Sequence, residues 1–294
     1  MFVILLLLII STAAGIGAGI AIRAWPQADP TRSATAAVED QLVRWRRLRG
    51  FIRSRMDPAT ATGLALTVAL LAVVVVGIGI GVVAYMIRTN SGVVRIDQTI
   101  TRWAMAHTGT AAFRMLEFLT ALGSTPVIIV VALAGATIGW WKRRDISIPF
   151  FFTLVVLGQL AASNLIKFAV ERVRPDLGPL GPLGPLGTPS FPSGHSTAAA
   201  ATYAALALVL GRDRTPRARS VLSGIAVGIA VAVACSRVLL GVHWFSDVVA
   251  GLALGWTWFA LCAVAFGGRV LWFGAPAATA SAPALSRDSV GSTR

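Results

Sequence analysis

The sequence is poor in acidic residues, cysteine and histidine. Its 294 residues include 12 Asp and Glu against 26 Lys and Arg, so the formal net charge is +14. The two cysteines, Cys235 and Cys262, lie in apolar runs without a Cys-x2-Cys spacing. This pattern indicates neither a disulfide framework nor a structural zinc site. Histidine occurs three times, so any histidine chemistry is confined to few positions.

Charged residues of both signs are scarce, at 13% of the chain, whereas apolar residues make up 56%. Apolar runs of about twenty residues recur, which is typical of a polytopic membrane protein. Arg-rich cytoplasmic loops therefore explain the positive charge better than nucleic-acid binding does. We predict an all-α transmembrane bundle with seven spans, at residues 1–22, 62–87, 126–141, 146–168, 196–210, 221–239 and 247–266.

The segments that flank these spans define the domain organisation. No basic residue precedes residues 1–22, and Arg23 follows directly, which predicts a retained transmembrane helix with its N-terminus outside; cleavage as a signal peptide is the alternative. Residues 23–61 carry eight arginines and form a cytoplasmic segment, either partly a basic amphipathic helix on lipid or a solvated stop-transfer segment. Residues 62–267 form the membrane domain, and residues 268–294 a disordered tail.

Shorter elements connect the spans. Residues 94–107 have apolar residues at helical spacing and predict an interfacial helix, in which His107 caps the apolar face without a role in chemistry. A helix at residues 112–122 leads into the third span after a break at Gly123-Ser124. Three Leu-Gly-Pro units at residues 177–185 predict a stiff, extended loop over the membrane face.

The distribution of basic residues predicts the orientation in the membrane. The segment 23–61 and the loops 142–145 and 212–219 share one side and carry 15 of the 26 basic residues. This side is therefore expected to be cytoplasmic. The loops 169–194 and 240–246 are separated by two spans, so both lie on the other side in either orientation.

A cluster of ionisable residues separates the last two spans. Arg237, His243 and Asp247 lie together there, and ionisable groups near lipid are costly enough to indicate a functional site. If the last helix begins near Gly241, His243 and Asp247 are at positions i and i+4 on one face. The carboxylate can then hold one imidazole nitrogen and leave the other free as a nucleophile. The alternative is an Arg-Asp pair that pins two helix ends beside a bystander histidine.

Two further motifs lie in the loop 169–194 and its flanks. Lys167 and Arg174 are two helical turns apart, so both cations can bind one phosphate, unless they only snorkel at a helix end. Ser193, Gly194 and His195 precede a helical run, where free N–H groups bind anions and a histidine can act as an acid. The alternative is an ordinary capped helix start.

The three motifs together resemble the type 2 phosphatidic acid phosphatase (PAP2) superfamily. They read Lys-x6-Arg-Pro, then Pro-Ser-Gly-His, then Ser-Arg-x5-His-x3-Asp, complete and in order. The resemblance covers residues 96–266 and implies a six-helix core, which leaves the first helix and the Arg-rich segment as additions. It implies that His243 is the nucleophile, oriented by Asp247, and that His195 is the acid and then the base. It also implies phosphate binding by Lys167, Arg174, Ser193, Gly194 and Arg237.

No metal or other cofactor is implied, because fixed cations and N–H groups can stabilise the phosphoryl charge and Asp247 is assigned to His243. The resemblance suggests a lipid phosphate as substrate, in a bilayer and at an extracytoplasmic site. Undecaprenyl pyrophosphate is the first candidate, and phosphatidic acid and phosphatidylglycerol phosphate are alternatives. A phosphotransferase, or a lipid-binding or transport protein that keeps the site for binding alone, would be a different function. The sequence does not determine the oligomeric state.

Overall fold

The computed structural model describes residues 2–24, 61–175 and 188–266. Most of the Arg-rich segment, the Leu-Gly-Pro units and the predicted tail lie outside the described residues. The described part contains nine helices and no strand, which confirms the predicted all-α class. The helices are α1 (Phe2–Ala24), α4 (Ala61–Arg88), α5 (Val93–His107), α6 (Thr110–Ala121), α7 (Thr125–Arg143), α8 (Ser147–Val170), α9 (Gly194–Gly211), α10 (Pro216–Leu239) and α11 (Phe245–Ala265).

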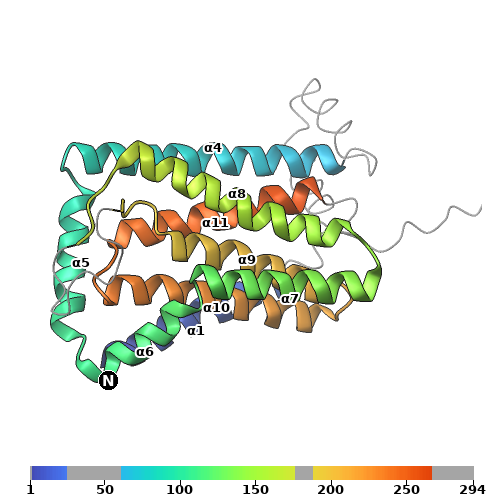
Figure 1. The fold of residues 1–294 in the computed structure, drawn as a ribbon, viewed down its shortest axis with the longest axis horizontal. Helices are drawn as coiled ribbons and strands as arrows, with labels where there is room; N and C mark the ends of the chain where they lie inside the picture. Colours follow the sequence, from blue (N-terminus) through green and yellow to red (C-terminus); the bar gives the residue numbers. More distant parts are fainter. Residues whose placement is uncertain (1, 25–60, 176–187, 267–294) are drawn as a thin grey trace, which may run out of the picture.

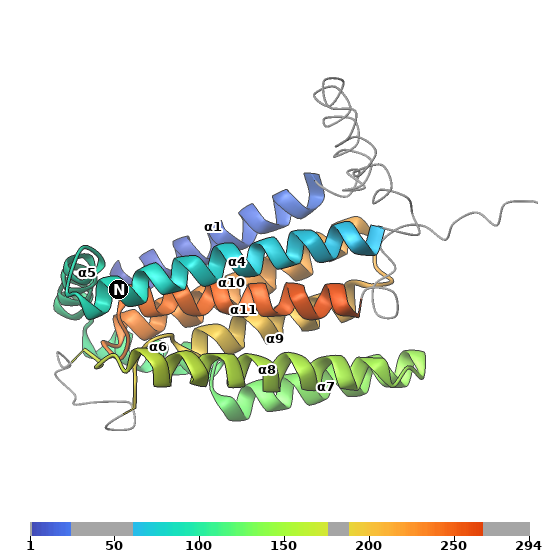
Figure 2. The ribbon, with the colours of Figure 1, turned by 90° about the horizontal axis from the view of Figure 1, so that it is seen from above.

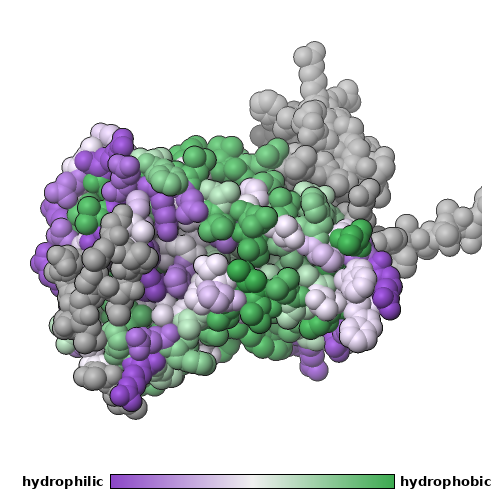
Figure 3. All heavy atoms as spheres, viewed as in Figure 1, coloured by the Kyte–Doolittle hydropathy of each residue, from purple (hydrophilic) through white to green (hydrophobic). Residues whose placement is uncertain are grey.

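Six of these helices are long and apolar enough to cross a membrane: α1, α4, α7, α8, α10 and α11. The remaining predicted span corresponds to α9, which is mostly buried among other helices. A helix covered by protein does not need the hydropathy that lipid contact demands, so alanine, serine and threonine suffice there. In Figure 3 a hydrophobic band separates the hydrophilic ends of the bundle, as expected for a membrane protein.

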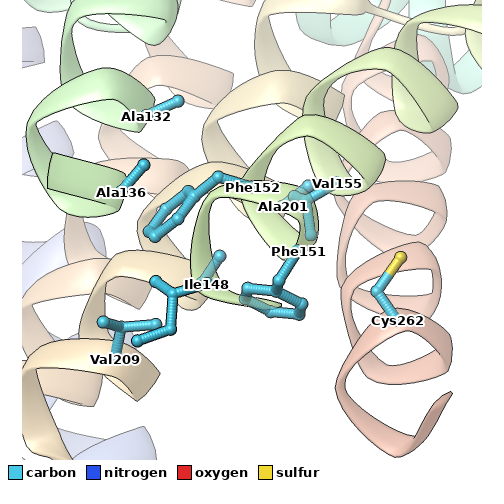
Figure 4. Close-up of a cluster of buried hydrophobic side chains, with 10 residues drawn as sticks. Ala132, Ala136, Ile148, Phe151, Phe152, Val155, Ala201, Val209 and Cys262 are labelled. Carbon is cyan, nitrogen blue, oxygen red and sulfur yellow. The ribbon is translucent and has the colours of Figure 1, made fainter. Parts of the chain in front are cut away.

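Helix α9 lies at the centre and packs against α7, α8, α10 and α11. Figure 2 shows α1 on one side of the bundle and α7 and α8 on the other. One apolar cluster joins α7, α8, α9 and α11, and Figure 4 shows Phe152 directed toward Ala132 and Ala136 while Phe151 lies on the side of Cys262. Both cysteines are free.

Helix α5 crosses one end of the bundle, roughly perpendicular to the spans (Figure 1). Its apolar positions do not face the protein interior as a block, because Ile96 and Trp103 are exposed. The buried face instead contains Asp97, Thr101 and Ala104. Helix α6 then leads to α7 across Gly123 and Ser124, where the predicted break is confirmed.

The added N-terminal helix packs along α10 through small residues. A Cβ atom on Gly15 would come within 2.6 Å of the Gly224 carbonyl oxygen, so the two backbones are in direct contact. One turn away, the Ser220 hydroxyl donates a hydrogen bond to the Gly19 carbonyl oxygen. Small residues at every fourth position allow this kind of close approach between membrane helices. The N-terminus lies at the end of the bundle that α5 crosses (Figure 1).

Small residues also allow α11 to pack closely against the start of α9. A Cβ atom on Gly251 would lie 2.7 Å from the Ser193 carbonyl oxygen. One on Gly255 would lie 2.8 Å from the Ala200 Cβ atom and would also collide with the Thr197 carbonyl oxygen. Glycine at these two positions therefore sets the separation of the two helices that begin at the same end of the bundle.

Replacing Gly255 with valine is expected to force α11 away from α9 and to lower the free energy of unfolding by about 1–3 kcal/mol, the usual cost of overpacking. Thermal unfolding in detergent measures this effect. Gly77→Val is the matched control, because no atom lies within 4 Å of a Cβ built on Gly77 in α4. Equal unfolding temperatures for the two variants would contradict the close α9–α11 contact.

Candidate active site

The three sequence motifs meet at the end of the bundle that α5 crosses. Helices α8 and α10 end there, while α9 and α11 begin there (Figure 1). Lys167 lies in the last turn of α8, and His195 in the first turn of α9. Arg237 lies in the last turn of α10, and Asp247 in the first turn of α11. Because successive helices run in opposite directions, residues that lie up to 80 positions apart in sequence come together at this end of the bundle.

The His243–Asp247 pair is present, but its setting differs from the prediction. His243 Nδ1 lies 3.3 Å from Asp247 Oδ2, and the Trp244 backbone N–H donates to the same oxygen at 3.1 Å. The helix begins at Phe245 rather than near Gly241. Gly241 has φ +68°, a left-handed turn that ends α10, so His243 lies in the loop before α11. Asp247 therefore serves both as a cap of α11 and as the partner of His243.

His243 is buried, with 1% of its surface exposed. Burial lowers its pKa to about 4, although the hydrogen bond and the charge of Asp247 oppose the shift. The imidazole is therefore neutral at neutral pH. With the Nδ1 proton assigned to the bond with Asp247, the lone pair is on Nε2, and Nε2 lies 3.1 Å from Arg174 Nη1.

Arg174 is held by the loop rather than by an acidic side chain. Its Nη1 donates to the Val242 carbonyl oxygen at 2.9 Å, and its Nε donates to the Thr188 carbonyl oxygen at 3.2 Å. Among the described residues, the ion pairs include no carboxylate bound to Arg174, Lys167 or Arg237. Three cations therefore lie together at this end of the bundle, and none of them is bonded directly to a carboxylate of the described residues, which is an arrangement suited to an anion.

Lys167 and Arg237 complete this positive environment. A Cβ atom on Gly194 would lie 3.6 Å from Lys167 Nζ, so the lysine lies against the start of α9. Arg237 Nη1 donates to Thr120 Oγ1 at 3.0 Å, while its buried Nε has no protein partner in the described part of the chain. This N–H is therefore free to donate to a bound group, such as a phosphate oxygen.

The start of α9 adds N–H groups and the second histidine. Ser193 is the N-cap and is fully buried, and its backbone N–H donates to the Asp247 carbonyl oxygen at 3.0 Å. The first N–H groups of a helix have no intrahelical acceptor and favour an anion. His195 is within electrostatic reach of His243 and of all three cations. Gly123 packs closely against this residue, since a Cβ atom on Gly123 would lie 3.1 Å from the His195 Cβ atom.

The structure also contains site residues that the sequence analysis missed. Arg172 Nη1 donates to Asp247 Oδ1, and Arg172 Nη2 donates to Asp97 Oδ2, both at 2.7 Å. Ser246 bonds to both Arg172 and Asp97. The sequence pointed to Asp97 only through the scarcity of acidic residues, since an aspartate in a predicted interfacial helix is unusual in this chain.

Two other observations delimit the site. His107 is exposed, and its Nδ1 lies 2.8 Å from the Trp103 carbonyl oxygen while its ring stacks on the Trp103 ring. It lies outside the three sequence motifs, and neither of these contacts involves a motif residue. Within the described ranges, no group of three or more His, Cys, Asp or Glu residues could hold a metal ion. The arrangement is thus a buried histidine–aspartate pair facing an anion site made of cations and a helix N-terminus.

Comparisons with known proteins give the same picture. A family model described as the PAP2 superfamily matches residues 148–270, which contain all three motifs. Phosphatidylglycerophosphatase B of Bacillus subtilis is 32% identical over 178 residues, which cover 59% of this chain and 84% of that protein. Lipid A 1-phosphatase of Rhizobium johnstonii is 42% identical over 118 residues, 38% of this chain and 43% of the relative.

A solved structure is also similar. The crystal structure of a transmembrane PAP2 type phosphatidylglycerolphosphate phosphatase from Bacillus subtilis has a TM-score of 0.59 and 29% sequence identity. The match covers 64% of this chain and 92% of that one. By motifs, fold and relatives, the chain belongs to the PAP2 superfamily and is a multi-pass membrane protein of its lipid phosphatase family.

Proposed function

We propose that the protein hydrolyses a lipid phosphate through a phosphohistidine formed on His243. The observation that carries this proposal is the state of the His243 ring. Its Nδ1 is held by Asp247, its low pKa keeps it neutral, and its Nε2 faces Arg174. A neutral histidine with one nitrogen engaged and the other facing a cation is arranged for attack on an anionic phosphorus centre.

The reaction has two displacements. In the first, His243 Nε2 forms a bond to phosphorus while the bond from phosphorus to the lipid oxygen breaks, and protonated His195 gives its proton to that oxygen. Burial and the neighbouring cations lower the pKa of His195 to about 3, so in this proposal the negative charge of the bound phosphate holds the proton on His195. In the second, neutral His195 takes a proton from water, and the water oxygen bonds to phosphorus. The phosphorus–nitrogen bond then breaks, and its electron pair returns to Nε2 as phosphate leaves.

The charge on the phosphoryl oxygens is balanced by fixed groups in this proposal. Lys167, Arg174 and Arg237 supply the positive charge, and Ser193 and the Gly194 N–H supply the helix N-terminus. Groups that are already oriented stabilise the transition state without reorganisation, so the proposed reaction needs no metal. Asp247 stabilises the positive charge that develops on the His243 ring as Nε2 bonds to phosphorus.

Phosphatidylglycerol phosphate is the substrate with most support, because a relative named for that activity matches over 84% of its length. The lipid A phosphatases match over less than half of theirs. Undecaprenyl pyrophosphate and phosphatidic acid stay predictions from sequence. All four have an apolar tail that stays in the bilayer while the phosphate reaches the end of the bundle.

Replacing His243 with alanine is expected to reduce phosphate release by about 10³-fold or more, as for loss of other catalytic nucleophiles. Release is measured in detergent with EDTA present, for phosphatidylglycerol phosphate, phosphatidic acid, lipid A and undecaprenyl pyrophosphate. His107→Ala is the matched control, because this histidine is exposed and both its hydrogen bond and its ring contact are with Trp103 of the same helix.

Release that EDTA does not affect and that is lost in His243→Ala alone would support the mechanism. Acid-labile radiolabel on the wild-type protein, absent from His243→Ala, would identify the phosphohistidine. Release that persists in His243→Ala would mean that another group is the nucleophile. Transfer of the label to an added alcohol in preference to water would favour the phosphotransferase.

The pH dependence follows from the lowered pKa of His243. The nucleophile must be neutral, and its neutral fraction falls as the pH drops through its pKa, which is about 4 instead of 6.5. The acid limb of kcat/KM due to His243 is therefore expected well below pH 6.5. The profile is measured with two substrates whose phosphate groups have different pKa values. A limb that shifts with the substrate is due to the phosphate group, and a limb that stays is due to the enzyme. An enzyme limb at or above pH 6.5 would be inconsistent with a buried, neutral His243.

The proposal places the active site on the extracytoplasmic face. The opposite end of the bundle carries Lys142, Arg143 and Arg144, and the basic loop after α9 also lies there. A phosphatase reporter fused after Arg294 is expected to be inactive, because it would remain in the cytoplasm, whereas a cytoplasmic fluorescent reporter would work. The reverse result would place the active site at the cytoplasmic face.

A further inference from the structure

A buried chain of charged groups connects α5 to the proposed nucleophile. It runs from Asp97 through Arg172 to Asp247 and ends at His243. Asp97 and Asp247 are completely buried, and Arg172 and His243 are at most 7% exposed. Asp97 lies outside the three sequence motifs, and Arg172 occupies an unspecified position of the first. Both side chains bond to other protein groups rather than facing the anion site.

The hydrogen bonds leave the Asp247 carboxylate one orientation. Its Oδ1 accepts from Arg172 Nη1, so Oδ2 is the oxygen available to His243 Nδ1 and the Trp244 N–H. Arg172 cannot turn away, because Ser246 Oγ accepts a further bond from the same Nη1 at 2.8 Å. The guanidinium also lies over the Trp244 ring, with its central carbon 5.2 Å from the ring centroid.

Asp97 fixes the other half of the Arg172 guanidinium. Asp97 Oδ2 accepts from Arg172 Nη2, and Asp97 Oδ1 accepts from the Ser246 backbone N–H at 2.8 Å. Ser246 Oγ donates to Asp97 Oδ2 at 2.6 Å. Asp97 thus lies at the N-terminus of α11, where the helix dipole favours a negative charge.

The charge of Asp97 matters as much as its geometry. Without the Asp97 carboxylate, the charge of Arg172 would neutralise that of Asp247, and the buried Arg172 Nη2 would have no acceptor. With it, two carboxylates share one guanidinium, and the group keeps a net negative charge beside His243. That charge stabilises the imidazole when Nε2 bonds to phosphorus and positive charge develops on the ring.

We infer that Asp97 and Arg172 are positioning residues that act through Asp247 to orient and charge-balance the His243 nucleophile. This inference rests on the proposed function. It makes α5, which the sequence analysis treated as an interfacial connector, part of the catalytic apparatus. The expected consequence is an effect on kcat rather than on KM, since neither residue faces the bound phosphate.

The test is Asp97→Asn, which keeps the shape of the side chain and removes the charge. Its kcat is expected to fall about 10–100-fold, as for other outer partners that orient catalytic groups, with KM changed less than about threefold. Asp213→Asn is the matched control. It removes an aspartate that is paired with Arg143 at the other end of the bundle, and wild-type kcat is expected.

A double-mutant cycle separates positioning from general loosening of the fold. If Asp97 acts through Asp247, adding Asp97→Asn to Asp247→Asn will change kcat less than about twofold. An equal fall in both backgrounds would overturn the inference. Ser246→Ala keeps all charges and is the second variant if Asp97→Asn is not recovered folded. It is expected to lower kcat a few-fold and to show the same loss of effect beside Asp247→Asn.

Nitrogen NMR of histidine-labelled protein gives a readout without turnover. The chain has three histidines, so His243 is assigned by its absence in His243→Ala. Wild type is expected to show the tautomer with the proton on Nδ1, and Asp97→Asn a larger share with the proton on Nε2. Unchanged tautomers together with wild-type kcat would overturn the inference and leave the proposed function standing. If the wild-type protein releases phosphate from none of the lipids, both the proposed function and this inference are contradicted.

Discussion

The carboxylate of Asp247 lies inside a largely apolar bundle, where an ionised group is stable only when its oxygens are hydrogen-bonded. The fold meets this requirement from three directions at once: the Trp244 N–H of its own helix start, His243 from the preceding loop and Arg172 from the end of α8. Each of these contacts also serves the site. The contacts that stabilise the buried Asp247 charge therefore also orient the ring of His243, the proposed nucleophile.

The alternation of spans explains why the site lies at one end. Two helices finish there with cations in their last turns, and two begin there with free N–H groups, Ser193 on one and Asp247 on the other. Close packing of α11 on α9 through Gly251 and Gly255 then sets the distance between the two helix starts. An anion at this end meets N–H groups, arginine and lysine, while the middle of the bundle stays apolar.

Much of this arrangement could be predicted from the sequence, because its signals are local. Apolar runs predicted the helices to within a few residues, apart from α10, which begins five residues earlier than predicted. Motif spacing predicted the candidate site residues that the structure brings to one end of the bundle: Lys167, Arg174, Ser193, Arg237 and His243. The last helix does not begin near Gly241, the condition on which the i, i+4 argument for His243 and Asp247 depended, since the left-handed turn at Gly241 depends on how α10 ends. The face of α5 was also unpredictable, because Asp97 is buried through bonds to Arg172 and Ser246, which lie 75 and 149 residues away in sequence.

The packing of α1 on α10 has a consequence for how the protein is made. The bond between Ser220 and Gly19 joins residues 201 positions apart. At synthesis rates of about 5–20 residues per second, α1 waits roughly 10–40 seconds in the bilayer before its partner is translated. During that interval the Ser11, Gly15 and Gly19 face lacks the α10 surface that it contacts in the folded protein. Helix α1 thus enters the membrane well before α10 and can complete its packing only after α10, which carries Arg237, is in place.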